Sequence, residues 1–106
     1  MRNTPDGVWV TMITPFTDTG RIDHPGVDLL VDWYIEHRVA GICTGCLASE
    51  SFELERDERL ELAERVVRRA AGRVPVVAGG NFDADPDRHV AEAHAVAPTG
   101  ADAVVI

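Results

Sequence analysis

The chain has 106 residues, of which 45% are hydrophobic, and a formal net charge of −8; these values fit one globular domain. The negative charge argues against nucleic-acid binding, which depends on clustered Lys and Arg. No apolar run reaches the ~18 residues of a membrane span, and two cysteines are too few for a disulfide framework. We therefore expect a cytoplasmic protein that binds neither nucleic acid nor a membrane.

Apolar, mostly β-branched runs alternate with helical patterns along the chain. Residues 8–14 predict a buried strand that ends at Pro15. Asp23 is a candidate cap for the following helix, and Pro25 suits its first turn. The apolar stripe of this helix comprises Val27, Leu30, Val31, Tyr34 and Ile35. Residues 41–45 then predict a second, short strand.

The second half of the chain repeats this alternation. Residues 54–71 carry the strongest helical pattern, with favourable i,i+4 charge pairs, and Gly72 closes it. These pairs are Glu55–Arg59, Glu61–Arg65 and Glu64–Arg68. Residues 74–78 predict a third strand, and residues 103–106 a fourth. Between them, Asp85 and Pro86 begin a third helix with the apolar stripe Val90, Ala93, His94 and Ala97.

The predicted order is strand-helix-strand-helix-strand-helix-strand, an α/β fold. Strands joined by helical crossovers run parallel, and their near-continuous apolar sequences indicate cover by helices. The last strand ends with the chain, so residues 1–106 look like one incomplete domain. We expect the open sheet to drive self-association, giving a homo-oligomer.

Three stretches of the chain together resemble the dihydrodipicolinate synthase / N-acetylneuraminate lyase family. The first comprises residues 7–16 and 20–23, the second runs from 41 to 59, and the third comprises residues 73–79 and 100–104. The resemblance covers essentially the whole chain. It implies a TIM (β/α)₈ barrel, of which this chain holds the N-terminal half: four strands and three helices.

The resemblance also implies a lyase that forms a Schiff base between a lysine and a small keto acid, usually pyruvate, without a metal or other cofactor. A loop after the second strand, Gly-Thr-Thr-Gly-Glu in the family, holds the keto-acid carboxylate. Here the loop reads Cys46-Leu47-Ala48-Ser49-Glu50. Leu47 and Ala48 replace both threonines, the Ser49 hydroxyl is a partial substitute as a substrate ligand, and Glu50 matches a structural glutamate.

The chain lacks two parts of the family's catalytic machinery. It contains no lysine, and Tyr34, its only tyrosine, falls on a helix stripe where a core role is expected. The family's tyrosine relay lies beyond residue 106. We expect the chain to be inactive alone, as the first half of a Schiff-base lyase. The alternative is a non-catalytic half-barrel that acts as a binding module.

Other motifs have simpler interpretations than a functional site. Cys43 and Cys46 have CxxC spacing, but a redox pair needs a helix N-terminus and a zinc site needs two more ligands; buried thiols are the expected state. The histidines show no ligand-like spacing. Residues 79–81 predict a tight strand exit rather than an anion cradle. The acidic positions Asp83, Asp85 and Asp87 predict helix capping rather than calcium binding.

Overall fold

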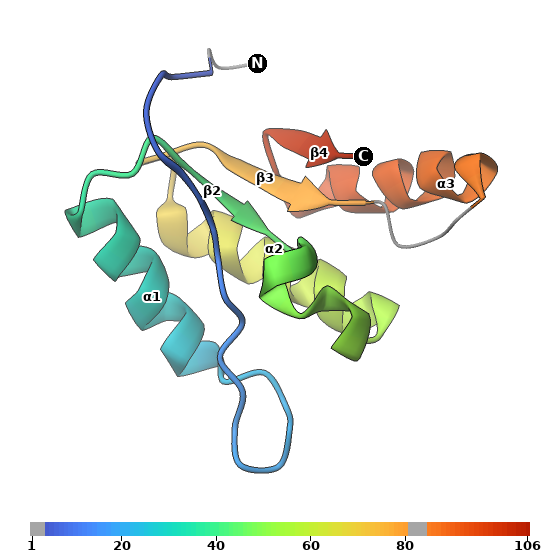
Figure 1. Cartoon of the computed structure of the whole chain (residues 1–106), viewed down its shortest axis with the longest axis horizontal. Coiled ribbons are helices and arrows are strands. Elements are labelled where there is room, and N and C mark those ends of the chain that lie inside the picture. The colour runs from blue at the N-terminus through green and yellow to red at the C-terminus, as the bar shows by residue number, and fades with distance from the viewer. Residues whose placement is uncertain (1–3, 81–84) are drawn as a thin grey trace.

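The computed structural model describes residues 4–80 and 85–106. Its strands are β1 (Trp9–Thr11), β2 (Gly41–Thr44), β3 (Val76–Gly79) and β4 (Ala103–Val105). They form one parallel sheet in the order β1-β2-β3-β4. The helices α1 (His24–Glu36), α2 (Arg56–Ala70) and α3 (Pro86–Val96) connect them (Figure 1). The predicted parallel α/β fold is confirmed. No helix in the described ranges is long and apolar enough to cross a membrane.

The hydrophobic core lies between the sheet and the helices. Ile42 and Val76 point from the sheet toward α1 and α2, and both are buried. The buried helix residues of the same cluster are Val27, Val31, Tyr34, Leu62, Val66 and Ala70. Asp23 caps α1 by accepting a hydrogen bond from the Gly26 N–H at 3.1 Å. Both the cap and the core role of Tyr34 agree with the sequence pattern.

Within residues 4–80 and 85–106, no helix covers the opposite face of the sheet. The strand register aligns Thr11, Cys43, Val77 and Ala103 in one row across this face. These four residues are half-buried or exposed. In a closed barrel this row would line the interior, because side chains of alternating residues point inward.

Trp9 covers the amino-terminal end of the same face. Its ring lies across Gly41, where an added Cβ would stand 2.2 Å from a ring carbon. The indole N–H donates to the Pro5 carbonyl at 3.1 Å, which holds the ring in this orientation. Glycine at position 41 is therefore required by the close approach of Trp9.

Helix α2 begins two residues later than the pattern predicts. Leu54 ends a short 3₁₀ turn, and Glu55 is the cap, with its N–H donating to the Glu58 carboxylate at 2.9 Å. Glu61 and Arg65 interact through their charges, as their i,i+4 spacing predicts, but each side chain also reaches α1. Arg65 donates two hydrogen bonds to Asp28 of α1, and Glu61 lies 3.3 Å from the His24 imidazole.

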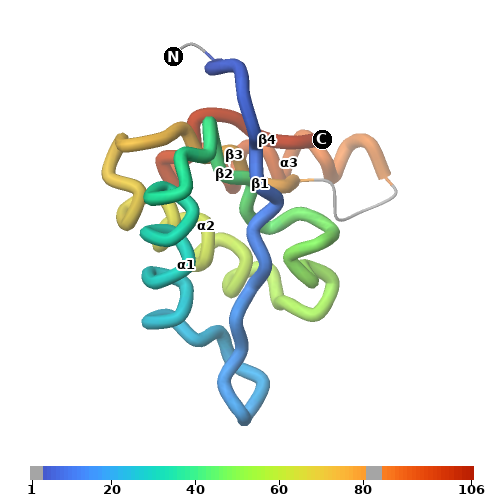
Figure 2. The backbone as a smooth tube through the Cα atoms, turned by 60° about the vertical axis from the view of Figure 1, so that its left-hand side comes forward, coloured from blue at the N-terminus to red at the C-terminus, as the bar shows by residue number. Residues whose placement is uncertain are grey.

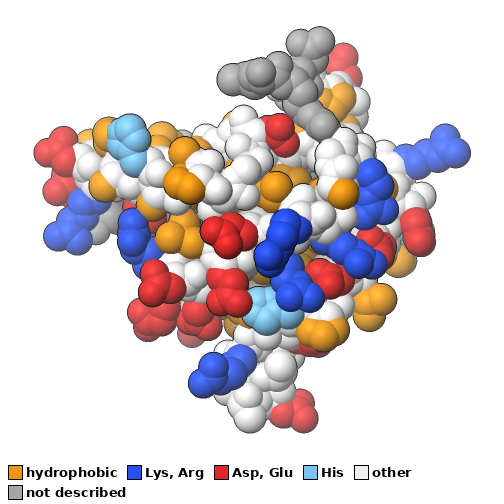
Figure 3. All heavy atoms as spheres, turned by 180° about the vertical axis from the view of Figure 1, so that it is seen from behind, with side chains coloured by type: hydrophobic (Ala, Val, Ile, Leu, Met, Phe, Trp, Pro, Cys, Tyr) orange, Lys and Arg blue, Asp and Glu red, His pale blue; other side chains and the backbone are white. Residues whose placement is uncertain are grey.

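Arginine–aspartate pairs join α1 to α2 along their length. Arg65 pairs with Asp28, and Arg69 and Arg73 both pair with Asp32. We call this set the α1–α2 clamp. Figure 3, which views the face behind that of Figure 1, shows acidic and basic side chains intermixed.

The predicted stripe of α3 is wrong. Val90 is 57% exposed, and His94 and Ala97 are exposed as well. Only Val96 among the α3 residues is buried. The helix is turned so that Glu92 faces α2, where its carboxylate meets Arg56 at 3.2 Å. Val96 packs with Ala63 of α2 and Ala78 of β3, so the spacing of the predicted stripe does not by itself fix the rotation of this helix.

Candidate functional site

The candidate site is the loop that leaves the carboxyl end of β2. It consists of two 3₁₀ turns, η1 (Leu47–Ser49) and η2 (Ser51–Glu53). Glu50 joins them in the left-handed region, with φ of 57°. Figures 1 and 2 show these turns and the segment between β1 and α1 at the same end of the sheet. Parallel α/β folds bind their ligands at this edge.

Ser49 anchors the loop to the end of β1. Its side chain is fully buried. The hydroxyl donates to the Met12 carbonyl at 2.5 Å and accepts from the Cys46 N–H at 3.3 Å. The Thr14 hydroxyl donates to the Ser49 carbonyl at 2.7 Å. In this structure the Ser49 hydroxyl is therefore occupied by backbone groups and faces the protein interior.

A second buried serine holds the other turn. Ser51 donates to the Cys46 carbonyl at 2.8 Å, and its side chain is fully buried. Neither Ser51 nor Thr14 is among the site residues that the sequence pattern predicts. Both are small hydroxyl residues beside a strand end, a position where such side chains commonly bond to the backbone. That signal would have identified them as loop anchors.

Leu47 and Ala48 lie on the outside of the first turn. Leu47 is 76% exposed, and Ala48 is exposed as well. Neither side chain has a hydrogen-bonding group. Any donor offered by these two positions is consequently a backbone N–H. The turn presents an apolar side chain where the resemblance places two hydroxyls.

Glu50 is exposed and lines a shallow hollow with Phe16, Gly20 and Glu53. Its left-handed backbone allows the chain to reverse between the two turns. Such a conformation is uncommon for a residue with a side chain. The position of Glu50 is thus set by its backbone as well as by its carboxylate.

The two cysteines are free thiols in half-buried positions. Burial raises the pKa of both, and the neighbouring Cys43 raises that of Cys46 further. Redox and metal chemistry require a thiolate, which a raised pKa disfavours. Within residues 4–80 and 85–106, no three His, Cys, Asp or Glu side chains converge as metal ligands. The CxxC interpretation gains no support.

The remaining sequence candidates are dispersed. His37 bonds to the Trp33 carbonyl at 2.8 Å, and His94 is exposed. Asp85 caps α3 by accepting from the Asp87 N–H at 3.0 Å, as predicted. A Cβ at Gly80 would stand 2.7 Å from a Val104 methyl, so this glycine permits close packing against β4. Asn81 and Asp83 lie outside the described residues.

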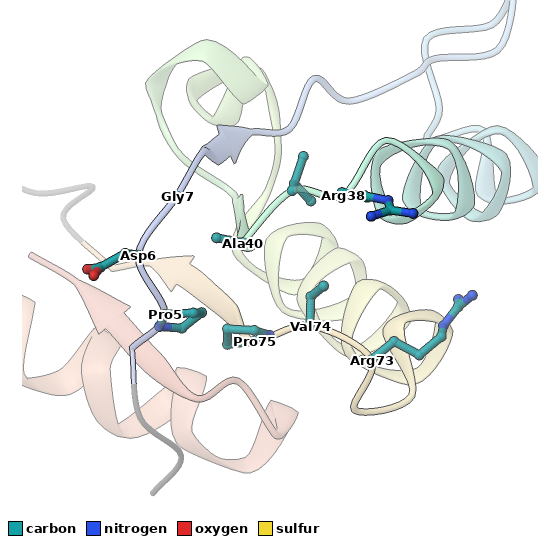
Figure 4. A pocket seen from close by; sticks show the side chains of 9 residues that line it. Pro5, Asp6, Gly7, Arg38, Ala40, Arg73, Val74 and Pro75 are labelled. Carbon is teal, nitrogen blue, oxygen red and sulfur yellow. The ribbon is translucent and has the colours of Figure 1, made fainter.

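A second hollow lies at the opposite, amino-terminal end of the strands. It is lined by Pro5, Asp6, Ala40 and Pro75, among others. Figure 4 shows that the side chains of Arg38 and Arg73 extend away from Asp6 rather than converging on it. In parallel barrels this end contributes to stability, and the opposite end to catalysis. The hollow is therefore not a competing active site.

The candidate site has neither the lysine nor the tyrosine that the family resemblance implies. The chain contains no lysine, and its only tyrosine, Tyr34, is buried in the core between helix and sheet. The loop therefore brings together a fixed backbone turn and an apolar side chain, without a lysine amine or a tyrosine hydroxyl. By itself this arrangement can position a ligand but offers no side chain for Schiff-base formation.

Proteins of known function share both the sequence and the geometry. The chain is 38% identical to 4-hydroxy-tetrahydrodipicolinate synthase of Methylococcus capsulatus over 102 residues, which cover 94% of this chain and 34% of that protein. The corresponding synthase of Jannaschia sp. is 37% identical with the same coverage. This chain thus spans about a third of the length of these relatives.

Solved structures agree with this result. Dihydrodipicolinate synthase from Bacillus anthracis superposes with a TM-score of 0.89 at 30% identity, covering 98% of this chain and 35% of that one. N-acetylneuraminate lyase from Mycoplasma synoviae gives 0.81 at 26% identity, covering 92% and 34%. The four-stranded sheet is therefore the N-terminal part of a TIM barrel. Since the model of the dihydrodipicolinate synthetase family also matches residues 4–106, the chain belongs to this family.

Proposed function

We propose that this chain supplies the first four strands of a barrel enzyme that makes or breaks a carbon–carbon bond next to a small keto acid such as pyruvate. The observation that carries this proposal is the family match across residues 4–106. The loop of Leu47–Ser49 supports it, because this loop lies at the edge of the sheet where such barrels bind substrates. We also propose a cytoplasmic location and chemistry without a cofactor.

The proposed chemistry divides the work between this chain and the rest of the barrel. A Schiff base requires a lysine amine freed by burial to attack the keto carbon. This chain has no lysine, so the amine has to come from the completing part. The loop after β2 positions the carboxylate end of the substrate. We therefore propose that the 106 residues alone are inactive.

The composition of the loop points to weak or altered recognition of pyruvate. With Leu47 and Ala48 in place of hydroxyl residues, only backbone N–H groups at these positions can donate to a carboxylate. A hydrogen bond to a charged group contributes about 1.5–3 kcal/mol. Losing it favours a keto acid whose binding depends more on apolar contact, which the exposed Leu47 side chain can supply.

The test is a fusion of this chain to the part of the Methylococcus capsulatus relative that follows the matched region. We call this fusion the completed barrel. Its turnover is assayed with several small keto acids and aldehydes, in both the condensation and cleavage directions. We expect activity that disappears when the active-site lysine of the relative's part is changed to alanine, and none from the isolated chain. A folded completed barrel that turns over no keto acid contradicts the proposal.

A second candidate, a non-catalytic binding module, is favoured by one observation. The loop has lost the hydroxyls expected at Leu47 and Ala48. Under this alternative, the completed barrel would bind a keto acid in calorimetry without turning it over. Measuring binding and turnover on the same preparation separates the two functions.

A further inference from the structure

A basic hollow lies between α1 and α2, the two helices that pack side by side on one face of the sheet (Figure 1). It is lined by Asp28 of α1 and by Arg65, Arg68 and Arg69 of α2, and its volume is about 390 Å³. We call it the arginine hollow. Three guanidinium groups facing one carboxylate give the hollow an excess of positive charge, although the chain as a whole carries −8. A hollow lined mainly by one sign of charge attracts ligands of the opposite sign.

The α1–α2 clamp fixes two of the three guanidinium groups. Arg65 donates to Asp28 and Arg69 donates to Asp32, each through Nε and Nη2. Two parallel hydrogen bonds of this kind set the plane of a guanidinium group as well as its position. In the described part of the chain, nothing accepts a hydrogen bond from Nη1 of either arginine. Both groups can therefore donate to a ligand without giving up their aspartate partners.

Arg68 lines the hollow but takes no part in the clamp. Its side chain is exposed, and among residues 4–80 and 85–106 its guanidinium group has no hydrogen-bond or ion-pair partner. It follows Arg65 by three residues on α2, a spacing that places two side chains on the same side of a helix. Glu61 interacts with Arg65 through its charge, but it does not line the hollow. Arg68 is thus the arginine of the hollow that is most available to a ligand.

We propose that the arginine hollow binds a phosphate group, either as inorganic phosphate or as a small phosphate monoester. Guanidinium groups recognise phosphate through parallel N–H bonds to its oxygens. A phosphate monoester carries roughly two negative charges near neutral pH and three acceptor oxygens, which suits three guanidinium groups beside one carboxylate. A carboxylate offers a single charge and two oxygens, and is the poorer match.

This site is separate from the loop after β2. The residues that line the arginine hollow belong to α1 and α2, and none of them lines the hollow beside Glu50. Helices form the outer ring of a parallel barrel, and these two already pack on each other. Completing the barrel therefore leaves the arginine hollow open. The inference goes beyond the proposed function and does not depend on it.

Calorimetric titration of the 106-residue chain with inorganic phosphate, at constant ionic strength, tests the proposal. We expect saturable binding that Arg68→Gln weakens at least about tenfold, because the variant loses a charged donor to the phosphate. Arg68→Lys keeps the charge without the planar fork, so it should bind with intermediate affinity. Arg21→Gln is the matched control, since it removes the same charge at an exposed position outside the hollow, and it should leave the affinity unchanged.

The outcomes separate specific binding from a general response to charge. Absence of saturable phosphate binding, equal weakening by Arg68→Gln and Arg21→Gln, or an equal affinity for chloride would each overturn the proposal. Glycerol phosphate distinguishes the two sources of the phosphate group. Equal affinity for both ligands indicates that the phosphate group alone is recognised, and tighter binding of glycerol phosphate indicates a monoester; either result supports the site.

A second measurement needs no variant. Phenylglyoxal modifies accessible arginines, and peptide mapping reports the rate at each position. Saturating phosphate should slow the modification of Arg68 severalfold and leave that of Arg21 unchanged. A rate at Arg68 that phosphate does not change would overturn the proposal. Because both measurements report binding, their result is independent of whether the completed barrel turns over a keto acid.

Discussion

Ser49 connects two segments that are far apart in sequence. Its hydroxyl bonds to the Met12 carbonyl and to the Cys46 N–H, and its carbonyl accepts from Thr14. All of these groups lie where the candidate site is formed. The geometry of the loop therefore depends on a small buried network, in which the loss of one member leaves others without partners.

Ser49→Ala should destabilise the protein by about 1–3 kcal/mol, because it leaves the Cys46 N–H and the Met12 carbonyl without their partner. Urea unfolding, followed by tryptophan fluorescence, measures this change. Ser49→Thr retains the hydroxyl and serves as a control for its loss. Unchanged stability in Ser49→Ala would show that the hydrogen bonds do not hold the loop.

Ala48→Thr should tighten the binding of pyruvate-like carboxylates by the completed barrel. One restored hydrogen bond to a charged group contributes at most about 1.5–3 kcal/mol, or roughly 10–150-fold in affinity. Isothermal calorimetry with pyruvate measures the effect, and Ala48→Val separates side-chain size from hydrogen bonding. Equal or weaker binding by the threonine variant would mean that Ala48 does not occupy the carboxylate-binding position.

For single residues, the sequence predicted which loop position corresponds to which family residue, but not the direction in which each side chain points. Flanking residues such as Gly41 and Glu58 align the loop by simple counting. Ser49 was expected to offer its hydroxyl to substrate, yet the structure turns it inward. The orientation depends on two short 3₁₀ turns, which have no periodic pattern that a sequence could reveal.

Helices α1 and α2 are joined by charge as well as by apolar packing. In the α1–α2 clamp, Asp32 accepts hydrogen bonds from Arg69 and from Arg73. These bonds lower the pKa of Asp32 from 3.8 to about 2. Arg65, through its hydrogen bonds, also lowers the pKa of Asp28. The clamp is thus fully charged near neutral pH.

The clamp predicts a specific loss of stability in acid. Since the folded-state pKa of Asp32 lies below its unfolded value, its stabilising contribution is present above pH 3.8 and disappears as the pH falls toward about 2. Asp32→Asn should therefore unfold at lower urea concentration than the original chain at pH 7. The difference in urea midpoint between the two proteins should become smaller as the pH falls from 4 to 2. A difference that does not change with pH would show that the clamp does not stabilise the protein through charge.

The elements themselves were predicted well, and their contacts less so. Strand and helix order, the Asp23 cap of α1 and the Asp85 cap of α3 all follow from local patterns. The helix-to-helix pairing of Arg65 and the rotation of α3 do not, because both depend on which elements become neighbours. Helix α3 packs through Val96 against Ala63 and Ala78, so Val90 and Ala97 stay exposed despite their apolar spacing.

The whole molecule is an open sheet with helices on one face. β1 and β4 each have a single neighbour in the described part of the chain. The row of Thr11, Cys43, Val77 and Ala103 faces away from the helices. Unpaired edges and uncovered apolar side chains both promote association. The alternation of elements and the family resemblance both predicted this open sheet from the sequence.

The isolated chain is accordingly expected to self-associate. Exposing apolar surface to water costs about 25 cal/mol per Å². The total cost for several exposed apolar side chains is several kcal/mol, which is comparable to the ~5–15 kcal/mol stability of a small domain. Multi-angle light scattering after gel filtration should show a dimer or larger species. A sharp monomer peak with a cooperative thermal transition would mean that the open edges are closed in another way.

The central claim is that this chain forms one part of a Schiff-base barrel and depends on a lysine outside its 106 residues. The most direct measurement is borohydride trapping with pyruvate, followed by peptide mapping, on the isolated chain and the completed barrel side by side. We predict a stoichiometric adduct on a lysine of the completing part, and no side-chain adduct on the isolated chain, which has no lysine. A folded completed barrel that forms no adduct, or a side-chain adduct on the isolated chain, would contradict the account.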